Sequence, residues 1–250
     1  MMSKGVLLFC FDTETSGYHR ILRRCVRLIR KNLKLPITVV TDIDTFHKIG
    51  DVGHVNYKLT TPEQGNKKDG KPWLNVDRHL AYDLSPYDTT LVMDIDYFPF
   101  TDNLRQFLDT GYDFLVSRQA HDLMVTDQSP RDRFSLIDMV WATILIFNRS
   151  PKSKMIFDAV KYVKQYYSHF TQLYRITARN FRNDYAFAIA LQQMNGFVDY
   201  EVLPMKLPTL MPECEILKID DNGLTWRHDN NVMYTFDQDV HVLNKEVADV

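Results

Sequence analysis

Two kinds of sequence pattern alternate along the first half of this chain, and the alternation constrains the fold more than any other feature. Short apolar runs rich in β-branched and aromatic residues, such as residues 6–11 and 37–41, are typical of buried strands. Segments with helical spacing of apolar residues separate them. Strands that alternate with helices form a parallel sheet, because each crossover helix returns the chain to the same end of the sheet. We therefore expect an α/β fold with a central, mostly parallel sheet flanked by helices.

The remaining elements extend this plan over one domain, and no linker-like segment divides the 250 residues. The expected strands are residues 6–11, 37–41, 55–59, 89–96, 113–116, 140–147 and 199–203. The expected helices are residues 18–35, 72–84, 103–109, 152–167 and 184–194, the last capped by Asn183. A proline-broken segment, residues 204–212, and a β-rich C-terminus complete the chain.

Asp94 and Asp96 follow the apolar run of residues 89–93. Carboxylates at the tip of a buried strand lie in the crevice where α/β proteins bind their ligands. A spacing of two residues on extended backbone directs both side chains to one side. Two such oxygen ligands suit Mg²⁺ or Mn²⁺ shared with a phosphate-bearing substrate. The alternative is an ordinary strand-end turn, where Asp is common.

The sequence contains two further Asp-x-Asp pairs with which the pair at 94 and 96 can be compared. Asp42 and Asp44 follow one apolar run, and Asp237 and Asp239 follow another. Apolar and aromatic residues continue beyond Asp96, whereas the pair at 42 and 44 runs into a polar stretch. We therefore expect the metal pair to be the one at 94 and 96.

The charges are unevenly distributed. The net charge is −2, which argues against general attraction to nucleic acid. Residues 18–35 nevertheless carry seven Lys and Arg residues and no acid, on one face of an amphipathic helix. Such a face is usually merely solvated. The alternative is a surface that meets the phosphates of a partner.

The cysteines and the hydropathy pattern indicate a cytoplasmic protein. Cys10, Cys25 and Cys214 are odd in number and far apart, and we expect buried thiols in a reducing compartment. There is no run of 18 apolar residues and no signal-like N-terminal segment, so we expect no membrane partner.

Residues 7–17 resemble the first motif of the DnaQ-like 3′–5′ exonucleases, in which an Asp and a Glu two residues apart hold two metals. Here these residues would be Asp12 and Glu14. The later motifs of that family are missing, and a helix follows where the family has further strands. A metal-dependent exonuclease therefore stays as an alternative.

A second resemblance covers most of the chain. The first strand and helix, the run Pro36-Ile37-Thr38-Val39-Val40-Thr41-Asp42, and the stretch from Trp73 to Asp96 resemble the GT-A glycosyltransferases, especially their glycogenin-like group. Asn183-Asp184 at the start of a helix and the segment Asp239-Val240-His241-Val242-Leu243-Asn244-Lys245 resemble two later motifs of that group. The order of the motifs matches as well. Trp141 and Thr143 depart from it, because the family usually has Asn before a small residue there.

The resemblance implies a GT-A fold and a metal-dependent, retaining transferase of hexosyl or pentosyl groups that uses a nucleoside-diphosphate sugar, UDP-sugar first. Residues 1–116 would bind the donor and residues 117–250 the acceptor. The implied metal ligands for Mn²⁺ or Mg²⁺ are Asp94, Asp96 and His241. The implied donor contacts are Asp12, Thr13, Asp42, Arg78, Asp94 and Lys245, and the implied catalytic residue beside the transferring sugar is Asp184.

The sequence does not identify the acceptor. Some small stand-alone relatives encoded by phages glycosylate hydroxymethylated DNA bases, and such an enzyme would act in the host cytoplasm. The cationic segment 18–35, together with Arg175, Arg179 and Arg182, would then contact DNA phosphates. Otherwise the acceptor is a carbohydrate. A non-catalytic module that binds a sugar nucleotide is the remaining alternative.

Overall fold

The structure, a computed structural model, describes residues 2–13, 16–68, 70–74, 77–124 and 134–249. A six-stranded sheet with the order β3-β2-β1-β6-β10-β8 forms its centre. The strands are β1 (Lys4–Phe9), β2 (Ile37–Thr41), β3 (Asn56–Leu59), β6 (Thr89–Met93), β8 (Phe114–Ser117) and β10 (Trp141–Asn148). Neighbours from β3 to β6 are parallel, and β10 is antiparallel to both β6 and β8. The expected mostly parallel α/β sheet is confirmed.

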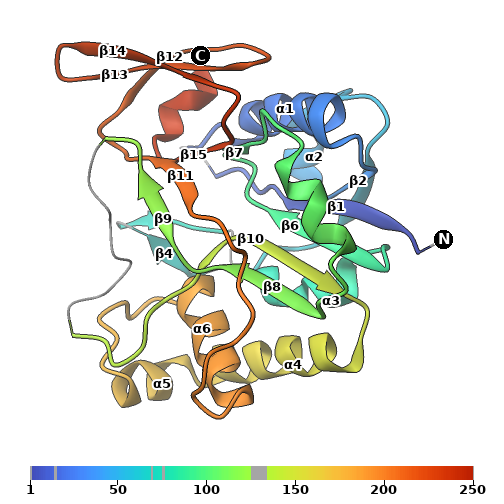
Figure 1. The fold of residues 1–250 in the computed structure, drawn as a ribbon, viewed down its shortest axis with the longest axis vertical. Helices are drawn as coiled ribbons and strands as arrows, with labels where there is room; N and C mark the ends of the chain where they lie inside the picture. Colours follow the sequence, from blue (N-terminus) through green and yellow to red (C-terminus); the bar gives the residue numbers. More distant parts are fainter. Residues whose placement is uncertain (1, 14–15, 69, 75–76, 125–133, 250) are drawn as a thin grey trace.

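Both faces of the sheet are covered, which explains the continuous apolar character of its strands. Val6 and Leu8 of β1 pack into one core with helix α1 (Tyr18–Leu28), whereas Leu7 and Phe9 point to the other face. That face is covered by α4 (Pro151–Gln165), α5 (Tyr167–Leu173) and α6 (Asn183–Met194), which lie together below the sheet in Figure 1.

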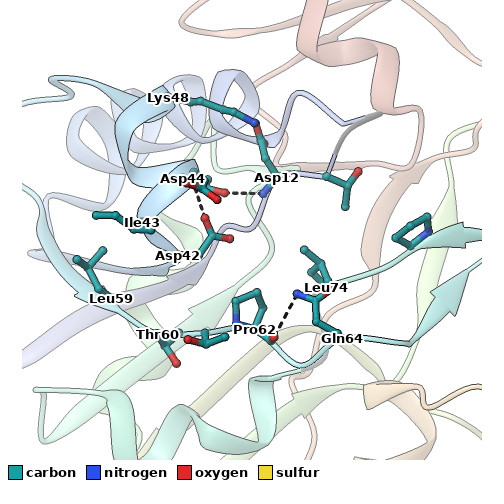
Figure 2. A pocket seen from close by; sticks show the side chains of 14 residues that line it. Asp12, Asp42, Ile43, Asp44, Lys48, Leu59, Thr60, Pro62, Gln64 and Leu74 are labelled. Atoms are coloured by element: carbon teal, nitrogen blue, oxygen red, sulfur yellow. Dashed lines mark hydrogen bonds and ion pairs between the residues drawn. The ribbon is translucent and has the colours of Figure 1, made fainter.

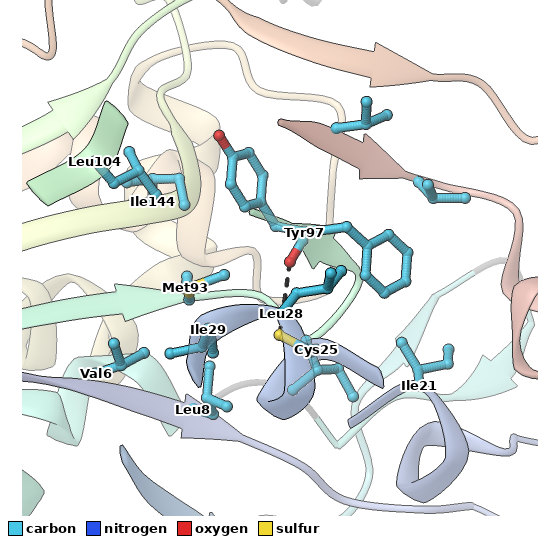
Figure 3. Packing of buried hydrophobic residues seen from close by; sticks show 14 of the residues in the cluster. Val6, Leu8, Ile21, Cys25, Leu28, Ile29, Met93, Tyr97, Leu104 and Ile144 are labelled. Atoms are coloured by element: carbon cyan, nitrogen blue, oxygen red, sulfur yellow. Dashed lines mark hydrogen bonds between the residues drawn. The ribbon is translucent and has the colours of Figure 1, made fainter. Parts of the chain in front are cut away.

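Figure 3 shows the core on the α1 side, where side chains of α1, β1 and β6 meet residues from beyond the strand tip. The Cys25 thiol of α1 donates to the backbone oxygen of Tyr97 at 3.6 Å. Tyr97 is fully buried and directly follows Asp96. The packing therefore holds the turn after β6 against the first helix.

A second sheet brings the C-terminal part of the chain to the same place. Its order is β7-β15-β11-β9, formed by β7 (Tyr97–Phe98), β15 (Val240–Val242), β11 (Leu207–Leu210) and β9 (Ala120–Asp122). Strand β15 pairs antiparallel with β7, with His241 opposite Tyr97. A separate antiparallel sheet of β12 (Glu215–Ile219), β13 (Gly223–His228) and β14 (Asn231–Phe236) lies at the top in Figure 1.

Some expected elements differ from the structure. The helix expected at 72–84 is reduced to the 3₁₀ turn η2 (Asp77–Leu80) and the short α3 (Ala81–Leu84), after the hairpin strands β4 (Lys67–Lys68) and β5 (Lys71–Pro72). Pro72 lies in that hairpin and starts no helix.

Three further differences concern helix caps and strands. Residues 43–49 form helix α2 (Ile43–Ile49), although they read as a polar loop. No strand forms at 199–203, and β11 lies inside the segment interrupted by prolines. Asn183 is the buried first residue of α6, and Arg182 occupies the cap position without a side-chain cap bond.

Three short elements complete the description. The basic helix continues from α1 into a π-helical turn, η1 (Ile29–Leu33), residues 103–109 form the 3₁₀ turn η3 (Asn103–Asp109), and the chain ends in η4 (Lys245–Asp249). Among the described residues, no helix is both long and apolar enough to span a bilayer.

Candidate metal centre and adjoining pocket

Asp94 and Asp96 lie in the tight turn between β6 and β7. The Asp94 N–H donates to the Thr143 carbonyl of β10 at 3.0 Å, and the Tyr97 N–H donates to the Asp94 carbonyl at 3.1 Å. The Asp96 carbonyl accepts from the Val242 N–H of β15 at 2.9 Å. Backbone bonds from two neighbouring strands therefore fix the direction in which both carboxylates point.

Strand β15 adds an imidazole to these carboxylates. His241 Nε2 lies 3.5 Å from Asp96 Oδ1 and 3.9 Å from Asp94 Oδ2. One ligand atom from each of the three residues lies within 4.8 Å of the others, which is close enough to hold one metal ion. The ligands come from residues 94, 96 and 241, so the long-range pairing of β7 with β15 assembles the cluster.

Two cations contact the same carboxylates. The Arg78 guanidinium of η2 pairs with Asp94, and its Nη1 donates to the Ala142 carbonyl at 2.8 Å. The Lys245 ammonium pairs with Asp96. Two negative and two positive side chains therefore balance at this point, in a site where Arg78 and Asp96 are both buried.

Burial and the neighbouring charges set the protonation of the cluster. Burial alone would raise the pKa of Asp96, but Lys245 and His241 outweigh this effect and hold the pKa well below its usual range. Burial lowers the pKa of His241, which favours the uncharged imidazole that a metal ligand must be. Among the described residues, its Nδ1 has no hydrogen-bond partner. Two carboxylates and one imidazole fit Mn²⁺ or Mg²⁺.

Asp184 lies in the first turn of α6, where a carboxylate is favoured by the helix dipole. Its Oδ1 accepts from the Ala142 N–H at 3.1 Å, and its Oδ2 lies 3.6 Å from Arg182 Nη2. The backbone N–H of Ala142 donates to Asp184, and its carbonyl accepts from Arg78. Strand β10 therefore contacts both the predicted catalytic acid and the arginine that pairs with Asp94.

A cavity of about 880 Å³ opens along the carboxyl ends of β1 and β2 (Figure 2). Asp12, Thr13 and Asp42, three of the predicted donor contacts, all line it. The cavity is bounded on the other side by a strap, residues 60–68 and 70–74, that contributes Thr60, Thr61, Pro62, Gln64, Pro72 and Leu74.

The carboxylates in this cavity already have partners. Asp12 accepts from the His19 N–H at 3.0 Å and from the His19 ring at 2.6 Å, and Lys48 Nζ lies 3.6 Å away. Asp42 caps α2, because its Oδ1 accepts from the Thr45 N–H at 2.6 Å. Lys48 and Gln64 also line the cavity and were missed by the sequence analysis. Recognising residues 43–49 as a helix would have placed Lys48.

The other Asp-x-Asp pair outside this cavity has a structural role. Asp239 is buried and accepts from the Thr101 N–H at 2.7 Å and from the Thr101 hydroxyl at 2.8 Å. In the part of the chain that the structure describes, Asp94, Asp96 and His241 are the group of acidic and imidazole side chains that meets the geometry of a metal site. Glu14, the second acid of the exonuclease-like motif, lies outside the described residues.

The cations of the basic helix are partly used inside the protein. Arg27 pairs with Asp221 at 3.2 Å, Lys31 donates to the Asp221 carbonyl at 2.9 Å, and Arg23 Nε donates to the Ile49 carbonyl at 2.7 Å. The sequence has no acid within this helix, but the fold supplies partners from α2 and from the turn between β12 and β13.

Comparison with known proteins supports the fold. No protein-family model matches the sequence, and no curated protein matches it. Among solved structures, the galactosyltransferase LgtC in complex with donor and acceptor sugar analogs is similar, with a TM-score of 0.50 and 14% identity over 75% of this chain and 70% of LgtC. An active-site mutant of LgtC gives a TM-score of 0.50 and 14% identity over 76% of this chain and 69% of the other. The chain therefore has the GT-A glycosyltransferase fold.

Proposed function

We propose that this protein is a metal-dependent glycosyltransferase that moves a sugar from a nucleoside-diphosphate sugar, UDP-sugar first, to an acceptor. The observation that carries the proposal is the convergence of Asp94, Asp96 and His241 at the end of β6, beside a cavity at the carboxyl ends of β1 and β2. Ligands of α/β proteins bind outside these strand ends.

The charges of the site support a diphosphate as the ligand. The carboxylates of Asp94 and Asp96 are balanced by Arg78 and Lys245. A divalent metal added to this balanced set leaves a net charge of about +2, and a buried excess of charge is unfavourable unless it is paired. The diphosphate of a sugar nucleotide supplies the missing negative charge. We therefore expect metal and donor to bind together, each strengthening the other.

The roles of the side chains follow from this arrangement. Asp94, Asp96 and His241 would hold Mn²⁺ or Mg²⁺, which stabilises the negative charge that develops on the leaving diphosphate. Arg78 and Lys245 would donate to the diphosphate oxygens, because both lie against the metal carboxylates. Asp12, Thr13 and Asp42 would bind the nucleoside in the cavity. In this proposal residues 1–116 bind the donor and residues 117–250 the acceptor.

Asp184 is the proposed catalytic residue beside the transferring sugar. The anomeric carbon gains positive charge as its bond to the diphosphate breaks, and a nearby carboxylate offsets that charge. Ala142 ties Asp184 to the strand that also contacts Arg78, which supports this placement. We infer retention of the anomeric configuration from the resemblance to the glycogenin-like group. The anomer of the product, read by NMR, tests it.

We propose a carbohydrate acceptor in preference to a hydroxymethylated DNA base. A DNA acceptor would need cations that are available to phosphates, whereas Arg23, Arg27 and Lys31 contact other parts of the chain. Binding to duplex DNA that is detectable at low ionic strength and weakens with salt would contradict this choice. It would favour the DNA base as the acceptor.

Incubation with Mn²⁺ and a panel of UDP-, GDP- and CDP-sugars tests the function. We expect one nucleotide sugar to be hydrolysed slowly without an acceptor, and this hydrolysis to stop when Asp94→Asn replaces the wild type. Metal-dependent binding of a nucleotide sugar without any turnover would indicate a non-catalytic module. Degradation of single-stranded DNA that requires Asp12 would instead support the exonuclease.

A further inference from the structure

Lys164, in the last turn of α4, touches three separate segments. Its Nζ pairs with the Glu63 carboxylate, lies 3.3 Å from His79 Nε2 and 3.8 Å from Asp77 Oδ1, and sits 5.4 Å from the centre of the Phe181 ring. Only 14% of its side chain is exposed. A nearly buried ammonium with this many contacts is unlike an ordinary surface lysine.

These contacts belong to three parts of the chain around the site. Glu63 lies in the strap that bounds the cavity. Asp77 and His79 flank Arg78 in η2, so Lys164 meets η2 through the neighbours of the residue that contacts Asp94. Phe181 precedes Asp184 by three positions. One ammonium therefore joins the cavity wall, the Arg78 turn and the start of α6.

Further contacts join the strap to the residues just before α6. Asn66 Nδ2 donates to the Phe181 carbonyl at 3.1 Å, and Asn180 Nδ2 donates to the Lys67 carbonyl at 2.9 Å. The Arg182 guanidinium lies 5.3 Å from the centre of the Trp73 ring. These contacts fix the edge of the strap, and Lys164 adds an ammonium between Glu63 of the strap and Asp77 of η2.

The electrostatics of Asp77 show why the ammonium matters. Asp77 is 4% exposed. Burial raises the pKa of its carboxyl, and Lys164 opposes that rise. Without Lys164 the buried carboxylate loses its nearby cation, which is costly unless the carboxyl protonates or moves toward water. The turn η2 is only four residues long, so a shift of Asp77 displaces its neighbour Arg78.

We propose that Lys164 is a positioning residue that holds the donor-pocket wall, Arg78 and Asp184 in their working arrangement. The contacts described above include no member of the metal cluster and no proposed substrate position, so Lys164 acts through the segments that it joins. The inference rests on the proposed glycosyltransferase function. It adds that binding of the donor against the strap and placement of Asp184 are mechanically linked.

Steady-state kinetics of Lys164→Met, Lys164→Arg and Lys161→Met with the donor identified above test this role. Lys161 is the matched control, because it lies one turn earlier on α4 and pairs with Asp83 at 2.7 Å on the surface. For Lys164→Met we expect kcat/KM to fall about 10- to 100-fold, with both kcat and the donor KM affected, since a misplacement of about 1 Å costs that much. Lys164→Arg keeps the charge, so its kcat/KM should stay within about threefold of the wild-type value. The same holds for the kcat/KM of Lys161→Met.

The kinetic parameters separate positioning from simple stabilisation. A merely structural lysine would lower the melting temperature of Lys164→Met and leave kcat and KM unchanged well below that temperature, which would overturn the proposal. If Lys164→Met fails to fold, Glu63→Gln cuts only the contact to the strap, and we expect a raised donor KM with unchanged kcat. An unchanged KM in Glu63→Gln would then overturn it. A wild type that turns over no nucleotide sugar contradicts the proposed function itself, whereas an active wild type with unaffected variants contradicts only the role of Lys164.

Discussion

Asp96→Asn tests the metal centre at the more buried of its two carboxylates. The change removes one of two anionic ligands while keeping the size of the side chain, and Asp96 is held in place by backbone bonds that do not involve its carboxylate. Changes to groups that merely support a metal ligand cost about 10- to 100-fold in affinity. Loss of a direct carboxylate should exceed about 100-fold, or about 2.7 kcal/mol of binding free energy.

The same substitution should affect folding much less. Removing one partner of a fully buried ion pair costs about 3–5 kcal/mol. The side chain of Lys245 is 38% exposed, so its ammonium can turn toward water once Asp96 is neutral. We therefore expect a loss of only about 1–2 kcal/mol in the free energy of unfolding.

Calorimetric titration of Mn²⁺, and of UDP in the presence of Mn²⁺, measures the effect on binding, and thermal unfolding followed by circular dichroism checks the fold. Asp237→Asn is the matched control, because Asp237 is exposed and belongs to an Asp-x-Asp pair outside the cluster. Mn²⁺ affinity of Asp96→Asn within about threefold of wild type would refute the assignment.

Three further outcomes are expected from other parts of the molecule. Asp42→Ala should weaken UDP binding, and loss of the α2 cap should lower the free energy of unfolding in urea by about 1 kcal/mol. Asp42→Ser should restore the free energy of unfolding but not UDP binding. Equal UDP affinity in the wild type and both variants would remove Asp42 from the nucleoside site. Phe157→Ala should cost about 3–5 kcal/mol of unfolding free energy, because the ring is fully buried between α4 and the sheet; a loss below about 1 kcal/mol would contradict that packing. Burial raises the pKa of Cys25, and all three cysteines are buried, so a thiol reagent at about pH 8, near the pKa of a free thiol, should label them only after unfolding; rapid labelling of the native protein would contradict their burial.

Most of the central sheet could be predicted from the sequence because its strands are buried on both faces. Residues 37–41 form β2 at the expected positions, since a continuous apolar run is characteristic of such strands. Residues 43–49 were missed as a helix because α2 is short and buries little, and Asp42 reads equally well as a turn residue. Residues 199–203 form no strand, although the Leu203 N–H donates to the Val116 carbonyl of β8 at 3.0 Å, because a local pattern does not specify which strand a segment pairs with.

The candidate site was predictable only in part. Asp94 and Asp96 are close in sequence, and strand geometry brings them together. His241 lies far along the chain from Asp96 and enters through the pairing of β15 with β7, which local pattern does not encode; the family resemblance alone suggested it. No local rule indicated Lys164, because its role arises from three segments that meet only in the folded chain.

Diffraction from crystals grown with Mn²⁺ and UDP, recorded at a wavelength where manganese scatters anomalously, tests the central claim most directly. We predict one strong anomalous peak at a coordination distance of about 2 Å from oxygens of Asp94 and Asp96 and from His241 Nε2, with diphosphate oxygens completing the shell and Arg78 and Lys245 against them. A peak elsewhere, or UDP bound away from these residues, would contradict the account.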